Sequence, residues 1–477
     1  MLCATVSGPS FIEAQQQILH SRSFVDSIEL RIDYLLSLSN NEITELVALA
    51  KQPILTLKKH PSFSEDLWIQ RVIDLAKLGP EYLDIDKDFP QEALKHIRKK
   101  YPNVKIILSF HSDTEEHISN LYDEMAKQEA HHYKIAITPK SSLNTFRYIK
   151  IKKQLPNNTT VLCMGTSGTA SRILSPIINN GINYAAAINA PKAAPGQLSL
   201  PDLLAYNYFG LSSESRIYGL IGNPVDRSIS HISHNKLFSD LHLPASYIKI
   251  LLETQELKEF VSLTRELPFG GLSVTMPFKT AILDFIDVLD VSAKNCQSCN
   301  TLVFNNNEIT GYNTDGQGLL NLLKNKNIKL HATQVGIVGS GGSAKAIATT
   351  LASSGANIHI FNRTEAHAKE LAELCCGKAF PLSALSHHSP IDILILCVPP
   401  NVEIPEVFPP VIIDINTLPK ESNYTKKAKE HGCQILYGYE MFAQQALLQF
   451  SLWFPEKISQ KDQETFLLNV ENTVSTM

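Results

Sequence analysis

Residues 334–364 read QVGIVGSGGSAKAIATTLASSGANIHIFNRT, and this stretch decides the fold of the C-terminal half of the chain. An apolar run is followed by a glycine turn, an alanine-rich segment and a second apolar run, NIHIF. This order of strand, turn, helix and strand is typical of the nucleotide-binding half of a doubly wound α/β sheet. A glycine triplet alone is a weak signal, but its place between a strand and a helix favours nucleotide binding over an ordinary turn.

The glycine turn predicts which residues meet the cofactor. Glycines let the backbone approach a pyrophosphate at a helix N-terminus. The small residues of this fingerprint are Gly339, Gly341, Gly342 and Ala344. The second run ends in Asn362, Arg363 and Thr364, where an NAD enzyme usually has an acidic residue. Because arginine favours a 2′-phosphate, we predict NADP rather than NAD, with Lys345 as a further positive charge near the phosphates.

The composition of the whole chain bounds the class of protein. Its 477 residues are 44% hydrophobic and 19% charged, with a formal net charge of -4, which suits two or three packed cores. This charge predicts no basic surface for nucleic acid or an anionic membrane, so we expect small-molecule substrates as partners. No run approaches the ~20 apolar residues of a membrane span, and the opening MLCATVSGP lacks targeting features, so we expect a cytoplasmic protein.

The eight cysteines are scattered, mostly within apolar runs. Cys296 and Cys299 form one CxxC pair without a second pair. Because a zinc site needs four ligands, the pattern favours buried thiols, and we predict no metal.

Upstream of the glycine turn, residues 1–210 repeat one rhythm of a short apolar run, a turn and an amphipathic stretch. Strands that alternate with helices pair in parallel through right-handed crossovers, and eight such units predict a (β/α)8 barrel. The eight runs are Leu2–Ser7, Ser27–Asp33, Pro53–Lys58, Tyr82–Asp86, Lys105–Phe110, Tyr133–Thr138, Thr160–Gly165 and Ile182–Asn189.

The polar stretch SSES at 212–215 predicts a domain junction. We therefore expect a barrel over residues 1–212 and a two-subdomain α/β unit over 213–477. Within the second unit we expect three parts. These are a mainly substrate-binding subdomain at 216–314, a Rossmann subdomain at 330–437, and C-terminal helices at 438–477 that return to the first subdomain.

Lys134 lies among apolar neighbours in the sixth predicted strand, Tyr133–Thr138. If it faces the barrel interior, burial should lower its pKa and leave a neutral amine that attacks a ketone to form an imine. The alternative is a lysine on the outer face, covered by a helix, which is the more common case for one lysine taken alone.

Other polar residues gather at the carboxyl ends of the predicted strands and favour the interior position. Glu29 and Arg31 share one face of the second strand, and Asp33 should continue that face. Single residues of this kind are usually structural, but active sites of such barrels form at this end, so their convergence predicts a site. Further residues that follow strands are His111, Arg172 and Gln197.

The second unit shows polar clusters at similar places. Ser228 and Ser230 precede a predicted helix and would suit a carboxylate, although a simple helix cap is equally plausible. Lys279 follows the strand in GGLSVTMPFK, where a lysine is more often exposed than catalytic. Asn300 and Asp315 follow in CNTLVF and GYNTDGQG, and Asp315 also suits a helix cap.

Together, the barrel motifs resemble type I 3-dehydroquinate dehydratases over nearly all of residues 1–210. These motifs are ELRID, His111, KIA at 134–136, MGTSGTASR at 164–172 and APGQ at 194–197. The resemblance implies that Lys134 forms a Schiff base and that His111 is the general base and acid. It implies that Glu29 orients His111 or binds a substrate hydroxyl. It also implies that Arg172 binds the substrate carboxylate and that Arg31 and Gln197 bind other oxygens.

The barrel departs from that family at three places. Lys58 and Ser62 stand where the family usually has arginine and glutamate, and Ala193 stands where it has serine. We expect Lys58 to contact the substrate in place of that arginine. These departures put binding strength in doubt more than chemistry, because Lys134 and His111 remain.

Residues 216–477 resemble shikimate dehydrogenases. The resemblance implies that Lys279 and Asp315 handle the proton that accompanies hydride transfer from NADPH. The substrate-binding residues that it implies are Ser228, Ser230, Thr275, Asn300 and Gln445. His231, Ser273 and Thr417 depart from the family, which usually has proline, asparagine and tyrosine there.

The two resemblances predict consecutive steps of the shikimate pathway, which leads to aromatic amino acids. Dehydroquinate would lose water to give 3-dehydroshikimate, which would then be reduced to shikimate. Two alternatives remain open: a quinate/shikimate dehydrogenase fusion that uses NAD, and a non-catalytic metabolite sensor of the same fold. The sensor is disfavoured because all the reactive side chains are present.

Overall fold

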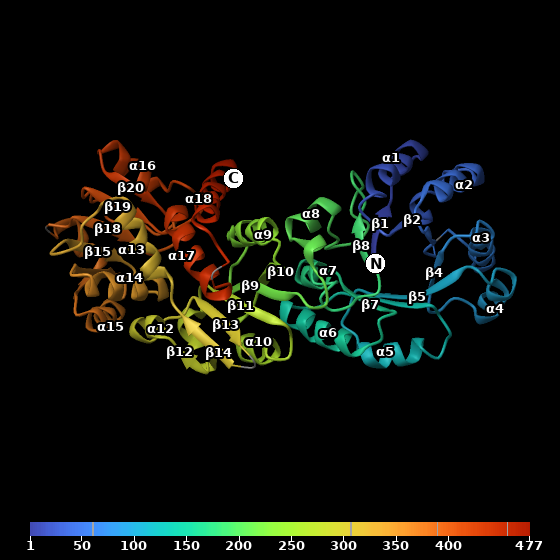
Figure 1. Ribbon diagram of the computed structural model, residues 1–477, viewed down its shortest axis with the longest axis horizontal. Helices are drawn as coiled ribbons and strands as arrows, with labels where there is room; N and C mark the ends of the chain where they lie inside the picture. The colour runs from blue at the N-terminus through green and yellow to red at the C-terminus, as the bar shows by residue number, and fades with distance from the viewer. Residues whose placement is uncertain (60–61, 306–307, 389, 456) are drawn as a thin grey trace. The chain divides into compact units, whose positions relative to one another are not determined.

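Eight parallel strands form the first sheet, in the order β7-β6-β5-β4-β3-β2-β1-β8 (Figure 1). The computed structural model describes residues 1–59, 62–305, 308–388, 390–455 and 457–477. The strands are β1 (Leu2–Val6), β2 (Ser27–Arg31), β3 (Ile54–Thr56), β4 (Tyr82–Asp86), β5 (Lys105–Ser112), β6 (His132–Ile137), β7 (Thr159–Cys163) and β8 (Asn183–Ala186). The predicted (β/α)8 barrel is confirmed, in a nearly closed form.

The two ends of this sheet, β7 and β8, are joined by side chains instead of a strand ladder. The Thr160 hydroxyl donates to the Ile182 carbonyl and accepts from its amide, at 2.9 and 2.8 Å. The Asn180 side chain both accepts from and donates to the backbone of Val161. These bonds satisfy backbone groups that an open edge would leave unpaired.

Helices follow the strands and lie outside them in Figure 1. Several begin at a serine whose hydroxyl accepts a backbone N–H, among them Ser10, Ser39 and Ser64. The helices are α1 (Phe11–Ser21), α2 (Asn40–Leu49), α3 (Glu65–Lys77), α4 (Gln91–Lys100), α5 (Ile118–Met125), α6 (Ser142–Gln154), α7 (Thr169–Ile173) and α8 (Leu200–Ala205).

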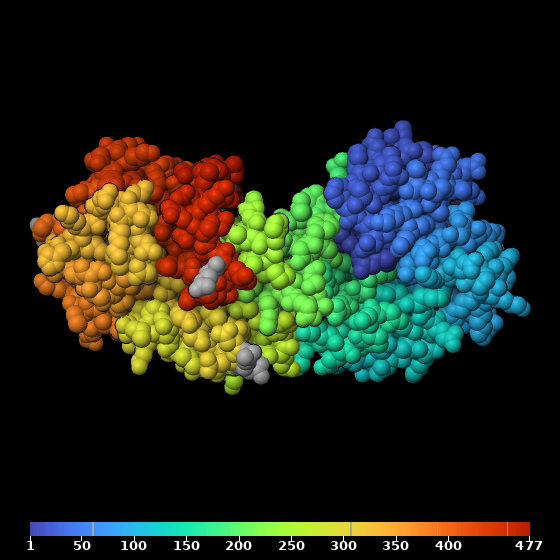
Figure 2. Space-filling view, in the orientation of Figure 1, coloured from blue at the N-terminus to red at the C-terminus, as the bar shows by residue number. Residues whose placement is uncertain are grey.

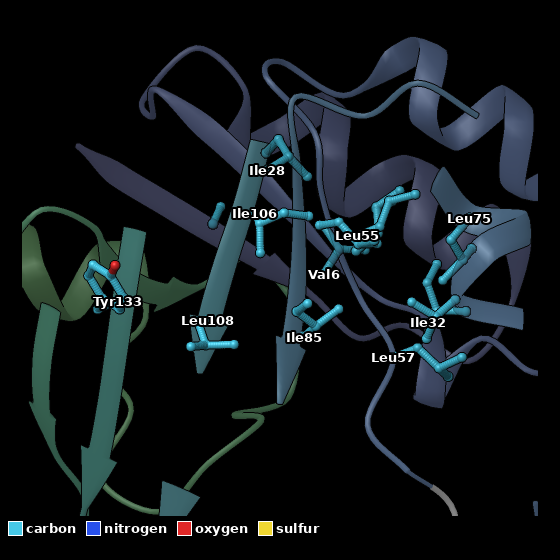
Figure 3. Packing of buried hydrophobic residues seen from close by; sticks show 14 of the residues in the cluster. Val6, Ile28, Ile32, Leu55, Leu57, Leu75, Ile85, Ile106, Leu108 and Tyr133 are labelled. Carbon is cyan, nitrogen blue, oxygen red and sulfur yellow. The ribbon is translucent and has the colours of Figure 1, made fainter. Parts of the chain in front are cut away.

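The barrel core lies between the strands and these helices. Val6, Ile28, Leu55, Ile85 and Ile106, from five neighbouring strands, pack in one buried cluster (Figure 3). Because alternate residues of a strand face opposite sides, their sequence neighbours point to the barrel interior, where the polar groups described below meet.

The predicted strand Ser27–Asp33 extends beyond the end of β2 at Arg31. Asp33 does not continue the face of β2, because Ile32–Tyr34 form a 3-10 turn after Arg31. The turn brings the Asp33 carboxylate back onto the Arg31 guanidinium, at 3.0 and 2.6 Å.

Two six-stranded sheets follow. The first has the order β10-β9-β11-β13-β14-β12 and is mixed, since β11 runs parallel to β9 and antiparallel to β13. Its strands are β9 (Arg216–Gly222), β10 (Ala245–Leu251), β11 (Phe269–Val274), β12 (Val288–Leu289), β13 (Thr301–Asn305) and β14 (Glu308–Tyr312). Its helices are α9 (Ser230–Asp240), α10 (Leu257–Thr264), α11 (Phe278–Ala281) and α12 (Val291–Cys296).

The second sheet is parallel and has the order β17-β16-β15-β18-β19-β20, the order of a Rossmann fold. Its strands are β15 (Gln334–Val338), β16 (Asn357–Asn362), β17 (Lys378–Pro381), β18 (Ile393–Leu396), β19 (Val411–Asp414) and β20 (Gln434–Tyr437). Its helices are α14 (Gly342–Ser353), α15 (Glu365–Cys375) and α16 (Asn423–Glu430). Sequence analysis missed β17, because this edge strand is short and carries no apolar run.

Three further helices complete this part: α13 (Asp315–Asn325), α17 (Gly438–Trp453) and α18 (Gln460–Thr476). Helix α17 packs against α13 and α18, and the red C-terminal helices form part of the surface in Figure 2. The Trp453 indole donates to the Leu302 carbonyl at 2.9 Å, which anchors α17 on the mixed sheet.

By their contacts, the residues group into two units. One unit is Met1–Arg216 with His242–Ser246 and Ser262–Leu267, and the other contains the rest. Among the described residues, no helix is both long and apolar enough to span a bilayer.

Candidate active sites

The barrel contains a cavity of about 320 Å³. The structure brings all the barrel residues of the predicted site to its lining. They are Glu29, Arg31, Lys58, His111, Lys134, Arg172 and Gln197.

Lys134 faces the barrel interior from β6 and is buried. Its Nζ donates to Asp84 Oδ2 at 2.9 Å and lies 3.6 Å from Glu29 Oε1. It also lies 3.9 Å from the centre of the Tyr184 ring, within range of a cation–π interaction. The outer-face alternative is therefore excluded.

The predicted charge state of Lys134 was wrong. Burial does lower the pKa of this amine, but the carboxylates of Asp84 and Glu29 outweigh it and raise the pKa above its usual value. Conversely, the pKa of Asp84 is lowered: burial opposes its charge, but Lys134 and Lys58 stabilise it more strongly. The resting pair is thus an ammonium and a carboxylate, so Lys134 has to release a proton before it can act as a nucleophile.

Glu29 does not contact His111. Its two oxygens accept hydrogen bonds from Thr5, at 2.7 Å, and from Thr56, at 2.8 Å. The expectation that Glu29 orients His111 is therefore wrong, and its carboxylate instead faces Lys134.

His111 lies on β5, at the mouth of the cavity, and its partner is a lysine. Lys58 Nζ lies 3.2 Å from His111 Nδ1 and 3.1 Å from the Ser109 hydroxyl. Although the ring is partly open to solvent, desolvation by the barrel wall lowers its pKa well below the usual value. The positive charges of Lys58 and Lys134 lower it further.

Arg172 offers an anion site. Its side chain is buried and forms no salt bridge with a described carboxylate. Its Nη1 donates to the Tyr184 carbonyl at 3.3 Å. Its Nε has no protein partner among the described residues. Burial lowers its pKa to about 10, so a carboxylate ligand would both pair with the charge and fill its remaining donors.

Arg31 and Gln197 are more engaged with the protein. Arg31 is paired with Asp33 and stacks on Tyr34 at 4.6 Å. The Gln197 amide accepts from the Ala193 N–H at 2.7 Å and donates to Thr5 at 3.3 Å. These contacts fix the orientation of both side chains in the cavity wall.

Sequence analysis missed Asp84 and Tyr184, although both contact the Lys134 amine. The signal for Asp84 was present in YLDID, where an acidic residue alternates with Leu83 and Ile85 and so faces the interior. Tyr184 gave no signal, because a tyrosine in a buried strand is ordinary core material.

The other unit contains a larger cavity, of about 660 Å³. Lys279 is largely buried, and its Nζ donates to Asp315 Oδ2 at 2.5 Å and to the Ser343 hydroxyl at 2.9 Å. Asn300 donates to the other oxygen of Asp315 at 2.7 Å. The exposed-lysine reading is therefore wrong, and Asp315 does not act as a helix cap through its side chain.

The remaining predicted residues of this cavity surround that pair. Gln445, on α17, accepts from Asn300 at 3.3 Å and from Thr314 at 3.2 Å. The hydroxyls of Ser228 and Ser230 lie 2.6 Å apart at the start of α9. Thr275 lines the cavity just after β11.

Ser273 and Thr417, two of the departures from the family, also line this cavity. The Ser273 hydroxyl accepts from Tyr247 and donates to Gln449, both at 2.6 Å. Its hydrogen-bonding capacity is thus taken by protein, which leaves little for a substrate.

The glycine turn fits a dinucleotide. Gly339 has a φ of 106°, and a Cβ there would meet the Cys397 carbonyl at 2.7 Å, so only glycine suits the position. A Cβ at Gly341 would meet no protein atom within 4 Å, which leaves room for a ligand at the start of α14. Gly342 instead packs against Lys279, and Ala344 is buried in α14.

The end of β16 carries the residues expected at the adenosine ribose. Arg363 is exposed, and Asn362 donates to the Thr364 carbonyl at 2.9 Å. This bond holds the turn that presents the guanidinium, which is free to meet an anion such as a 2′-phosphate.

Three family models match the chain. The type I 3-dehydroquinase model matches residues 2–211, the shikimate dehydrogenase substrate binding domain matches 220–302, and the shikimate / quinate 5-dehydrogenase model matches 321–404.

Whole-chain relatives agree with these matches. The chain is 54% identical to a shikimate biosynthesis protein AroDE from Chlamydia pneumoniae over 99% of both chains. It is 28% identical to a chloroplastic bifunctional 3-dehydroquinate dehydratase/shikimate dehydrogenase from Arabidopsis thaliana, over 95% of this chain and 82% of that one. Among solved structures, a chorismate mutase/shikimate 5-dehydrogenase fusion from Clostridium acetobutylicum aligns with a TM-score of 0.50 and 25% identity. That alignment covers 55% of this chain and 99% of the other.

Proposed function

Because the chain belongs to the AroDE family of shikimate biosynthesis proteins, it is a bifunctional dehydroquinate dehydratase and shikimate dehydrogenase, and we propose that its two cavities are the two active sites. The observation that carries the proposal is the meeting of Lys134, His111 and Arg172 in one cavity, with Lys279 and Asp315 paired in the other.

In the barrel, Lys134 attacks the ketone of 3-dehydroquinate and forms an imine with loss of water. The imine is an electron sink, so His111 can remove the proton from the neighbouring carbon. The same residue then returns the proton to the departing hydroxyl. Arg172 holds the substrate carboxylate, because its buried charge and free Nε lack a protein partner among the described residues.

Borohydride trapping tests this assignment. Reduction of the enzyme with dehydroquinate should add the mass of the trapped ligand to the peptide that carries Lys134. Lys134→Arg keeps the charge beside Asp84 but cannot form an imine, and it should lose both the adduct and the dehydratase activity. An adduct on another lysine would contradict the proposal.

Bound in the second cavity, NADPH would supply the hydride for the reduction of 3-dehydroshikimate. Gly339, Gly341 and the start of α14 would hold the pyrophosphate, and Arg363 would hold the 2′-phosphate. The Lys279–Asp315 pair supplies the proton to the alcohol that forms. Ser228, Ser230 and Gln445 bind the carboxylate and hydroxyls of the substrate, which places its carbonyl at that pair.

The ratio of kcat/KM for NADPH and NADH tests the cofactor proposal. Arg363→Ala should lower kcat/KM for NADPH by about 1–2 orders of magnitude and leave NADH almost unchanged, because only NADPH carries the 2′-phosphate. Equal losses with both cofactors would contradict this role. Lys369→Ala, which removes an exposed pair with Glu365 on the nearby helix α15, is the control.

We also propose a cytoplasmic location. All eight cysteines are described, and all are free thiols. Free thiols in this number suit a reducing compartment. Cell fractionation with the native protein tests this.

A further inference from the structure

The partner of His111 is unusual for a general base. Its Nδ1 lies 3.2 Å from Lys58 Nζ, and no described carboxylate lies within salt-bridge distance of the ring. A carboxylate or carbonyl partner would accept the Nδ1 hydrogen and leave Nε2 free to take a proton. A lysine can do this only as an uncharged amine, because an ammonium has donors but no acceptor.

The surroundings of Lys58 allow both charge states. Asp84 lies 3.7 Å away, and the amine donates to the Ser109 hydroxyl at 3.1 Å. Asp86 and Glu29 also favour the charged form, whereas burial and the neighbouring Lys134 oppose it. Burial has the larger effect, so the pKa of Lys58 is lowered. The positive charges of Lys58, Lys134 and Arg31 lower the pKa of His111 in turn.

We propose that Lys58 is the positioning residue of His111, and that its uncharged amine accepts the Nδ1 hydrogen of the imidazole during proton transfer. The proposal rests on the dehydratase function proposed above and assigns Lys58 a role beyond contact with substrate. An arginine could not take this role, because its guanidinium is always charged and has no acceptor.

The proton balance is simple. His111 Nε2 takes the proton from the carbon beside the imine, and the C–H electron pair moves into the imine to give an enamine. The enamine pair then expels the hydroxyl, which leaves as water with the proton from Nε2. Between these steps the imidazolium donates its Nδ1 hydrogen to the Lys58 amine, which stabilises the positive charge. Loss of the hydroxyl leaves the product as an imine on Lys134, and a water molecule then hydrolyses that imine, which releases the product ketone and frees the amine.

The sharpest test is Lys58→Arg, which keeps a cation at the same place. The expected result is a fall in dehydratase kcat of about 100-fold or more, the usual worth of a general base, with KM changed by about threefold at most. Shikimate dehydrogenase activity of the same chain should be unchanged, which shows that the variant is folded. If Lys58→Arg keeps its kcat and alters KM alone, Lys58 is only a substrate-binding cation and the proposal is overturned.

Chemical rescue separates an amine acceptor from a packing role. Methylamine should restore part of the dehydratase kcat of Lys58→Ala, and the rescue should rise with pH as the neutral amine fraction rises. No rescue, or rescue that follows the methylammonium ion, would contradict the proposal. Borohydride trapping at Lys134 should persist in both variants. If the wild-type enzyme itself gives no adduct at Lys134, the dehydratase mechanism fails, and that failure is distinct from failure of the role of Lys58.

Discussion

The Lys134 ammonium lies between two carboxylates and the face of an aromatic ring. This arrangement offsets the free-energy cost of burying the ammonium, and it fixes the position of the amine for the substrate. It also makes deprotonation of Lys134 a requirement of imine formation. The rate of that step should therefore rise with pH.

Asp84→Asn should shift this pH dependence to lower pH. The change removes the closest carboxylate, so that burial has the larger effect and lowers the pKa of Lys134. The initial rate of borohydride-trapped adduct, measured against pH, reports the shift. Glu81→Gln, which breaks the partly exposed pair with Lys105, is a matched control and should give no shift. An unchanged profile in Asp84→Asn would mean that Asp84 does not control the amine.

For single residues, the sequence predicts which side chains meet in the cavity but not their protonation states. The strand positions of Lys134, His111 and Arg172 follow from alternation within apolar runs, and the cavity contains all three. The raised pKa of Lys134 depends on Asp84 from β4 and Glu29 from β2, and the role of Glu29 depends on hydroxyls from β1 and β3. Such contacts between distant segments are not encoded in any local pattern.

Among the elements, α13 shows how helix packing fixes the position of Gln445, one of the residues that we propose to bind substrate. A Cβ at Gly318 would lie 2.8 Å from the backbone N of Gln445 and 2.9 Å from its Cα, so only glycine allows α13 and α17 to approach this closely. Gln445 would move with any shift of α17.

Gly318→Ala should therefore raise KM for shikimate and destabilise the protein by about 1–3 kcal/mol, the usual cost of overpacking. Steady-state kinetics and thermal unfolding measure the two effects. Gly341→Ala is the contrasting variant: a Cβ there meets no protein atom within 4 Å, so stability should hold while KM for NADPH rises. The reverse pattern would contradict the packing argument.

His132, at the start of β6, gives the barrel a pH-dependent stability. Its Nε2 lies 2.8 Å from the Thr160 hydroxyl, and burial, with the charge of Lys134, lowers its pKa to about 3. The unfolded chain, with a pKa near 6.5, then binds a proton that the folded barrel does not, so stability is lost as the pH falls below about 6.5.

We expect the barrel to lose about 1.4 kcal/mol per pH unit from this group between about pH 6 and pH 4. Urea unfolding, followed by hydrogen exchange of barrel peptides, measures the slope. His132→Gln, which can keep the bond to Thr160 but does not titrate, should flatten it. The same change at the exposed His20 is the control. An identical slope in wild type and His132→Gln would rule out this contribution.

The elements themselves were largely predictable. Apolar runs located all eight barrel strands, and the glycine turn located the Rossmann sheet. The errors share one cause, which is that a local pattern does not show how a strand ends or pairs. Asp33 turns back onto Arg31 instead of continuing β2. Strand β17 is defined by its pairing with β16 at the edge of the sheet, which no local pattern shows.

At the scale of the whole molecule, each unit contains its own cavity, and each cavity is lined by one of the two lysines that we propose to be catalytic. Lys134 and Lys279 have no partner in common among the described contacts. The two activities should therefore be separable by single substitutions, although one chain carries both. Two successive domains and their order were predictable because each has a complete set of strands in sequence.

A coupled assay tests the central claim most directly. With dehydroquinate and NADPH, the wild-type chain should consume NADPH as shikimate forms. Lys134→Ala should consume NADPH only when 3-dehydroshikimate is supplied, and Lys279→Met should not consume it with either substrate. A mixture of the two variants should regain activity on dehydroquinate. Consumption of NADPH by Lys134→Ala with dehydroquinate alone would contradict the account.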